Sequence, residues 1–299
     1  MSAVWMGYML AVISSVFSAV YVVPKKLSKL GPVTYAMIMG VGFFIASAAG
    51  FAVLKALGYI DEPLLIKYAP VACINGVVWT VASVSVLSAI DKIGLAKSNQ
   101  WKSLQGPVGA FLMLTFLSEF QTAKVAFILI AIILITLAAI LFSTREKDNA
   151  RVDKTGIIYA LIAAVFYGIS AALGKFLTNE GSRFSQQIYQ SLFVVISAAA
   201  YILVREKTLR IKAPKIGREI ALPLVGGVLF FGNSSFMILA YSYIEGSIVS
   251  MLHQLNAVWL LIIGVAVFRE IDFKRYWPRL AGGLALSIAG VLMLILAKV

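Results

Sequence analysis

The chain has 299 residues, of which 61% are hydrophobic and only 13% are charged, and its mean hydropathy is +0.94. A soluble protein cannot bury this much apolar surface, so we expect an all-α integral membrane protein whose solvent is the lipid bilayer. The net charge of +13 at pH 7 is spread over short, scattered loops, which excludes a nucleic-acid-binding protein. The single cysteine, Cys73, excludes an internal disulfide and a cysteine-based metal cluster.

Ten apolar segments follow one another, each of roughly 20 residues and therefore long enough to cross the hydrocarbon core as a helix. We expect these transmembrane helices at 3–23, 32–54, 68–90, 95–117, 122–142, 155–177, 184–204, 219–241, 247–268 and 278–297. Nothing alternates with the period of two that a β-barrel needs. The first segment has no basic residue before it and no small-residue cleavage site after it, so we interpret it as a retained helix.

Three residues of the first and third spans are candidates for a substrate site. Tyr21 lies at the end of the first span, shortly before Pro24. Asn75 and Trp79 lie one turn apart on the third span. A tryptophan inside a span can stack on the apolar face of a substrate, although core packing is the more frequent role of a large aromatic residue.

The fourth span opens with LAKSNQWKSLQGP (95–107), which is far more polar than an apolar helix requires. Lys102 lies about seven residues inside this span, roughly 10 Å from its start. Its ammonium either snorkels to the membrane interface or faces an aqueous path, where ionisable residues of membrane proteins usually lie. Asn99, Ser103 and Gln105 accompany it, and these polar groups serve either substrate binding or hydrogen bonding between helices. Gly106-Pro107 is expected to bend the span at this level.

The second half of the chain repeats features of the first half. GYMLAVISSVF (7–17) matches GIIYALIAAVF (156–166). An offset of 151 residues gives further matches, namely Gly76 with Gly227, Trp79 with Phe230, Ala89 with Ala240, and Glu119 with Glu270. Because each half holds five spans, the second copy must be inverted in the membrane, as in many secondary transporters. We therefore expect a first five-helix repeat at 1–143, a linker at 144–154 and a second five-helix repeat at 155–299.

The same offset places the polar stretch of the fourth span on SMLHQLNAV (250–258) of the ninth span. It sets Lys102 opposite His253, Ser103 opposite Gln254, and Gln105 opposite Asn256. Polar groups at one depth in both repeats favour two walls of a single cavity near the midplane. His253, the only histidine, is either a packing residue or a proton site or hydrogen-bond donor to substrate. Weaker candidates are Asn233 and Ser234 on the eighth span and Tyr167 and Ser170 on the sixth.

Basic residues divide unequally between the two sets of loops. The odd-numbered connections hold nineteen, and the even-numbered connections together with the termini hold six. The positive-inside rule then places the odd-numbered loops in the cytoplasm and both termini outside. We expect a multi-pass protein of the plasma membrane in this orientation.

Ten spans in two inverted halves, each with a glutamate after its fourth span, resemble the drug/metabolite transporter superfamily. The motif YVVPKKLSK (21–29) looks like the start of the L-rhamnose–proton symporter family. The segment NGVVWTVASVSVLSAIDKIGLAKS (75–98) is similar to the glucose/ribose porter family. This resemblance implies transport of a sugar or a similar polyhydroxylated metabolite. The chain departs from the glucose/ribose pattern at NQWKSLQGP, where the extra lysine leaves room for an acidic sugar or a carboxylate.

The expected function is a secondary transporter that carries a small polar metabolite, a sugar, by alternating access. Export or exchange of amino acids or organic anions on the same fold is the alternative. The sequence has one histidine, one cysteine and no carboxylate deep in a span, so it lacks the catalytic groups that an enzyme needs. It also lacks a Walker A motif, so we do not expect ATP to be the direct energy source. We expect a small-molecule substrate and the lipid bilayer as partners, and no cofactor. Proton coupling and the oligomeric state stay open.

Overall fold

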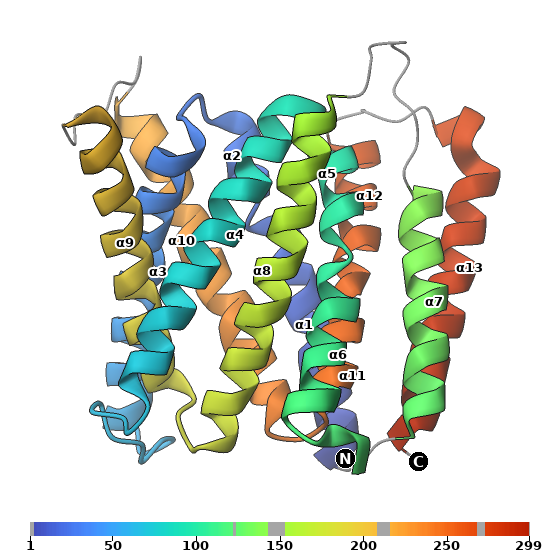
Figure 1. Cartoon of the computed structure of the whole chain (residues 1–299), viewed down its shortest axis with the longest axis horizontal. Coiled ribbons are helices and arrows are strands. Elements are labelled where there is room, and N and C mark those ends of the chain that lie inside the picture. The colour runs from blue at the N-terminus through green and yellow to red at the C-terminus, as the bar shows by residue number, and fades with distance from the viewer. Residues whose placement is uncertain (1–2, 122–123, 143–152, 208–215, 268–272, 299) are drawn as a thin grey trace.

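The computed structural model describes residues 3–121, 124–142, 153–207, 216–267 and 273–298. Every regular element in these ranges is a helix, which confirms the expected all-α class. The long helices run roughly alongside one another in one bundle, and both termini lie at the same end of it (Figure 1).

The first half contains α1 (Ala3–Val20), α2 (Val23–Leu27), α3 (Pro32–Ala56), α4 (Ala69–Ile93), α5 (Leu95–Lys102), α6 (Gln105–Phe116), the 3-10 helix η1 (Glu119–Gln121) and α7 (Val125–Phe142). The second half contains α8 (Lys154–Asn179), α9 (Phe184–Glu206), α10 (Ile216–Tyr241), α11 (Gly246–Leu252), the 3-10 helix η2 (His253–Leu255), α12 (Asn256–Ala266) and α13 (Phe273–Lys298).

Local sequence explains several helix boundaries. Proline occupies the first turn of α2, α3 and α4, where its missing N–H is not needed. Gly94 ends α4 with a φ of +79°, which a residue with a β-carbon rarely adopts. Asp153 caps α8 by accepting the Thr155 N–H at 2.8 Å, and this hydrogen bond holds the pKa of Asp153 below its usual value.

In the described part of the chain, seven helices are long and apolar enough to cross a membrane. They cover Ala3–Leu27, Pro32–Ala56, Ala69–Ile93, Lys154–Asn179, Phe184–Val204, Gly217–Tyr241 and Trp277–Ala297. They correspond to the expected first, second, third, sixth, seventh, eighth and tenth spans. The fifth corresponds to the shorter apolar helix α7.

The expected fourth and ninth spans, 95–117 and 247–268, are each divided into shorter helices. The fourth is divided into α5 and α6 around Ser103. Pro107 lacks an N–H, and its ring would clash with the carbonyl of Ser103 in a continuous helix, so the bend expected at Gly106-Pro107 becomes a break. The ninth changes to the 3-10 helix η2 at His253, although neither proline nor glycine lies in 250–258.

Close helix packing brings the two halves of the chain together. α4 packs on α8, α1 packs on α10, and α3 packs on both α9 and α10. α7 and α13 lie side by side at one flank of the bundle (Figure 1). Gly42 of α3 and Gly227 of α10 permit the α3–α10 crossing, because a β-carbon at either position would overlap backbone atoms of the other helix. The centre of the bundle is therefore built from both halves.

Candidate functional site

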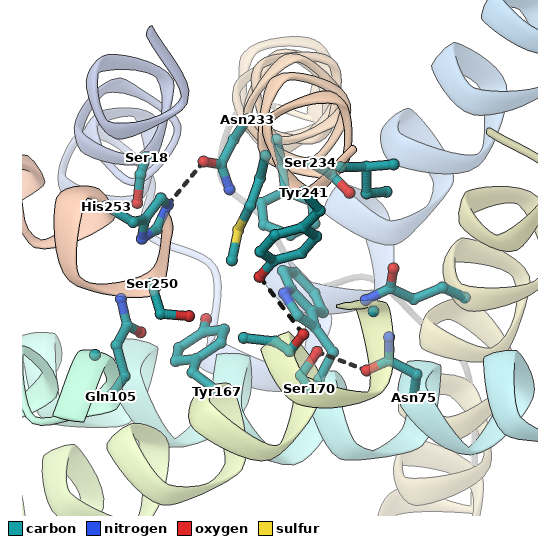
Figure 2. A pocket seen from close by; sticks show the side chains of 18 of the residues that line it. Ser18, Asn75, Gln105, Tyr167, Ser170, Asn233, Ser234, Tyr241, Ser250 and His253 are labelled. Carbon is teal, nitrogen blue, oxygen red and sulfur yellow. Dashed lines mark hydrogen bonds between the residues drawn. The ribbon is translucent and has the colours of Figure 1, made fainter. Parts of the chain in front are cut away.

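A cavity of about 80 Å³ lies between the helices of the two halves. Helices α1, α4, α5, α6, α8, α9, α10 and α11 and the 3-10 helix η2 all contribute lining residues. Figure 2 shows polar side chains from several of these elements converging on the same space. The lining amides are Asn75, Gln105, Gln186, Gln190, Asn233 and Gln254.

Most of the residues that the sequence singled out line this cavity. They are Tyr21, Asn75, Trp79, Lys102, Gln105, Asn233, His253 and Gln254. The weaker candidates Tyr167, Ser170 and Ser234 line it as well. The structure thus brings together groups from the first, third, fourth, sixth, eighth and ninth spans.

Three sequence candidates do not belong to the cavity lining, although all are buried. The Ser103 hydroxyl donates to the Asn99 backbone carbonyl at 2.8 Å and so stabilises the end of α5. The Asn256 amide donates to the Ser18 hydroxyl at 3.1 Å, and Ser18 itself lines the cavity. Asn256 therefore positions a lining residue from behind.

One wall of the cavity depends on Asn233 of α10. Its side-chain oxygen accepts the Ser14 hydroxyl at 3.0 Å and lies 2.9 Å from Nε2 of His253 (Figure 2). Since the amide oxygen is an acceptor, this contact places the proton on Nε2 of the imidazole. The three side chains tie α1, α10 and η2 together where the expected ninth span is broken.

The facing wall has a similar arrangement on α4 and α8. The Ser170 hydroxyl donates to the side-chain oxygen of Asn75 at 2.6 Å (Figure 2). Both side chains are buried, so the hydrogen bond satisfies groups that would be unfavourable alone in an apolar bundle. This hydrogen bond uses the side-chain oxygen of Asn75, so its amide N–H groups stay available to a ligand in the cavity.

Aromatic rings form another part of the lining. The Trp79 ring lies 4.5 Å from that of Phe230 and 6.2 Å from that of Tyr167, measured between centroids. Tyr21 contacts the Phe230 ring edge-on at 5.1 Å, and the hydroxyls of Tyr21 and Tyr167 lie 3.4 Å apart. Such faces suit the C–H side of a ring-shaped substrate.

Comparison with known families decides the class of this molecule. The family model described as sugar transport protein matches residues 61–297, which is most of the chain. The chain belongs to the sugar transport protein family. This confirms the expected resemblance to sugar transporters of the glucose/ribose porter type.

Structural comparison places this family member on a known fold. A solved crystal structure matches it with a TM-score of 0.69 and covers 99% of this chain and 98% of its own. The two sequences are 16% identical, so the likeness concerns the fold alone. No curated protein matches the chain.

Sequence reasoning missed the contribution of α9 to this sugar transporter's cavity. Gln186 and Gln190 line the cavity from one face of the helix, while Gln187 reaches Ser235 of α10 at 3.3 Å. The signal was present in SQQIYQ (185–190), where two glutamines stand four residues apart in an apolar span.

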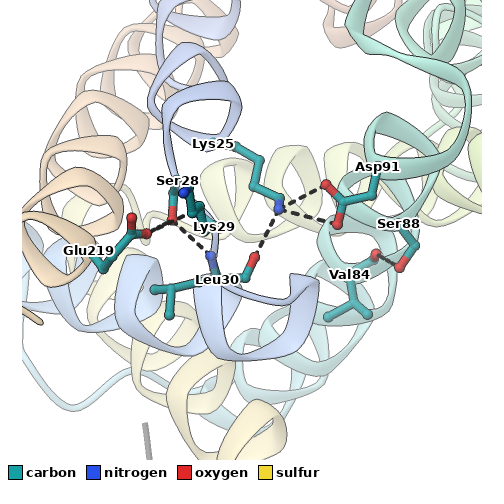
Figure 3. A network of polar contacts seen from close by, with 8 residues as sticks. All are labelled: Lys25, Ser28, Lys29, Leu30, Val84, Ser88, Asp91 and Glu219. Carbon is teal, nitrogen blue, oxygen red and sulfur yellow. Dashed lines mark hydrogen bonds and ion pairs between the residues drawn. The ribbon is translucent and has the colours of Figure 1, made fainter. Parts of the chain in front are cut away.

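Polar contacts hold both ends of the bundle. At the α2 end, Lys25 forms an ion pair with Asp91 at 2.9 Å, and Glu219 accepts the Ser28 hydroxyl at 2.6 Å and the Lys29 N–H at 2.8 Å (Figure 3). At the other end, Glu62 binds the first turn of α9: it accepts the Arg183 and Phe184 N–H groups at 2.7 Å and the Ser185 hydroxyl at 2.9 Å.

A second hollow, of about 470 Å³, lies next to the central cavity. Tyr241 lines both spaces, and Glu119 and Lys175 line the second. The Glu119 carboxylate accepts the N–H groups of Gly246 and Ser247, at 2.7 and 2.8 Å, at the start of α11. Its sequence counterpart, Glu270, lies outside the described residues.

Replacing Glu119 with alanine should lower the apparent Tm of the purified protein by several degrees. The change leaves two buried N–H donors without the carboxylate, and each charge-assisted hydrogen bond contributes about 1.5–3 kcal/mol. Thermal unfolding in detergent measures the effect, with the exposed Glu180→Ala as the matched control. Equal Tm values for the two variants would contradict a capping role for Glu119.

Proposed function

We propose that the chain is a secondary transporter that carries a sugar across the membrane by alternating access around the central cavity. The observation that carries this proposal is the cavity lining, which combines amides, hydroxyls and aromatic faces in a member of the sugar transport protein family. Amide groups can pair with neighbouring sugar hydroxyls, and the rings of Trp79 and Phe230 can cover the C–H face of the sugar.

The binding residues follow from the same lining. Tyr21, Asn75, Trp79, Lys102, Gln105, Asn233, His253 and Gln254 would contact the sugar directly, with Gln186 and Gln190 added from α9. Asn99, Ser103 and Asn256 would act from behind the lining, by holding α5 and Ser18 in place.

The architecture behind this mechanism is a pair of inverted five-helix repeats, 1–143 and 155–299, joined by the linker 144–154 and crossing the membrane ten times. A shift of 151 residues supports it, since it moves α3 (32–56) to 183–207, one residue from the bounds of α9. It also moves α5 to 246–253 and α6 to 256–267, which are the positions of α11 and α12 within one residue. The breaks in the fourth and ninth spans therefore coincide.

The helix contacts support the inversion as well. If α4 and α10 are counterparts, and likewise α8 and α1, then the packing of α4 on α8 mirrors the packing of α10 on α1. The packing of α3 on α10 is mirrored in the same way by that of α9 on α4. Such exchange of partners is what a two-fold axis between inverted repeats produces.

Rocking of the repeats would open the cavity first toward one end and then toward the other. Opening toward the α2 end would break the Lys25–Asp91 ion pair and the contacts of Glu219. Opening toward the other end would lead past Tyr241 into the second hollow. With the odd-numbered loops in the cytoplasm of a plasma-membrane protein, the α2 end is the cytoplasmic end and both termini lie outside.

Uptake by proteoliposomes containing the purified full chain tests the proposal. Labelled neutral monosaccharides, sugar acids, amino acids and organic acids are each offered, with protein-free liposomes as the control. We expect entry of monosaccharides or their acids above the control, and a pH gradient tests proton coupling. Entry of amino acids or non-sugar organic anions without any sugar would instead indicate the alternative exporter or exchanger.

A further inference from the structure

Lys102 occupies an unusual environment in the central cavity. It is the last residue of α5, its side chain is only 3% exposed, and it belongs to the cavity lining. Its ammonium lies over the ring faces of Tyr21 and Tyr167, 5.8 and 5.3 Å from their centroids. Among the described residues it has no hydrogen-bond acceptor or carboxylate partner.

Two other buried lysines show how this chain satisfies such a group. Lys25 has the Leu30 carbonyl at 2.9 Å and the Asp91 carboxylate at the same distance. Lys175 donates to the Tyr241 carbonyl at 2.7 Å. Two aromatic faces stabilise a cation, but they do not replace the hydrogen bonds that a buried ammonium loses on leaving water.

The described lining contains no aspartate or glutamate that could neutralise Lys102. A neutral sugar would leave this positive charge buried without a counter-charge, and that arrangement is unfavourable. A substrate with one negative charge would supply both the counter-charge and the missing acceptors. A carboxylate carries one charge, whereas a phosphate monoester carries about −1.5 to −2 at pH 7 and would leave an excess.

We infer that Lys102 receives the carboxylate of an acidic monosaccharide, so that the preferred substrates are sugar acids such as hexuronates. This inference rests on the proposed sugar transport and adds the charge of the substrate to it. The amides and the aromatic faces serve the hydroxyls and the ring, as they would for a neutral sugar.

Glucuronate and glucose, which differ only at carbon 6, provide a matched pair of probes. Their Kd values are measured by calorimetry on the full chain in detergent, for the wild type, Lys102→Met and Lys102→Arg. Lys67→Met, which changes an exposed lysine, is the control. We expect wild type and Lys67→Met to bind glucuronate about 10- to 100-fold more tightly than glucose, as expected for a charge-assisted hydrogen bond. Lys102→Met should remove the preference by weakening glucuronate binding far more than glucose binding, and Lys102→Arg should restore part of it.

The outcomes separate this inference from the function on which it rests. Equal affinity of the wild type for both sugars, or an unchanged preference in Lys102→Met, overturns the inference and leaves sugar transport standing. Tighter binding of glucose 6-phosphate than of glucuronate overturns the assignment to a carboxylate. A wild type that binds amino acids but no sugar overturns the proposed function, and the inference with it. The wild-type comparison needs no variant to fold.

Discussion

Replacing Gly227 with alanine should destabilise the protein by about 3 kcal/mol, at the upper end of the usual effect of overpacking. The new β-carbon would overlap the Met39 carbonyl oxygen and approach the Phe43 nitrogen at 2.5 Å. Both are backbone atoms of α3, which cannot rotate away as a side chain can. The α3–α10 crossing would have to open, and thermal unfolding in detergent should show an apparent Tm lower by about 5–10 °C.

Gly282→Ala is the matched control on α13. Its β-carbon would meet only Leu141 Cδ1 at 3.4 Å, an ordinary van der Waals distance. Because alanine favours a helix over glycine by about 1 kcal/mol, this variant should keep or slightly raise the Tm. If Gly227→Ala unfolds at the wild-type temperature, the close crossing of α3 and α10 is not what holds the two halves together.

Replacing Asn233 with leucine should reduce sugar uptake by about 100-fold. Leucine has a similar volume but removes the oxygen that accepts the Ser14 hydroxyl and faces Nε2 of His253. The Ser14 hydroxyl keeps the Asn233 backbone carbonyl as an acceptor at 3.0 Å. Nε2 of His253 is left without its acceptor, which is unfavourable by about 1–3 kcal/mol, so the imidazole should turn away from its position in the cavity. Initial uptake rates of proteoliposomes measure the loss.

Two further variants separate the role of this hydrogen bond from general damage. Asn233→Asp keeps an oxygen acceptor at the same place and should retain more activity than Asn233→Leu. Gln121→Leu removes an exposed amide on η1 and should transport at the wild-type rate. Full uptake by Asn233→Leu at wild-type stability would show that neither Asn233 nor the position of His253 matters for transport.

Several features of the site were predictable because polar residues stand out in an apolar span. Lys102, Gln105, His253 and Gln254 were selected in this way, and the cavity contains all four. Asn99, Ser103 and Asn256 belong to the same polar stretches, but they do not line the cavity. Distance along the chain does not show which face of a short helix turns toward a cavity, particularly where the helix breaks.

The change to a 3-10 helix at His253 could not be predicted from the local sequence either. Pro107 predicts the interruption of the fourth span because it lacks an N–H, whereas the ninth span has no proline at the corresponding place. There the 3-10 turn is accompanied by side-chain contacts with Asn233 and Ser18, which come from helices distant in sequence.

By itself, the sequence determined that the protein lies in a lipid bilayer, that it is helical, and where its apolar segments lie. A bilayer leaves a chain few ways to satisfy its backbone, and long apolar runs then mark the helices directly. Only the tertiary structure decided which polar groups meet in one cavity and which buried charge has no partner among the described residues. Those properties depend on contacts between residues such as Ser14 and Asn233, which lie 219 positions apart, and packing alone brings them together.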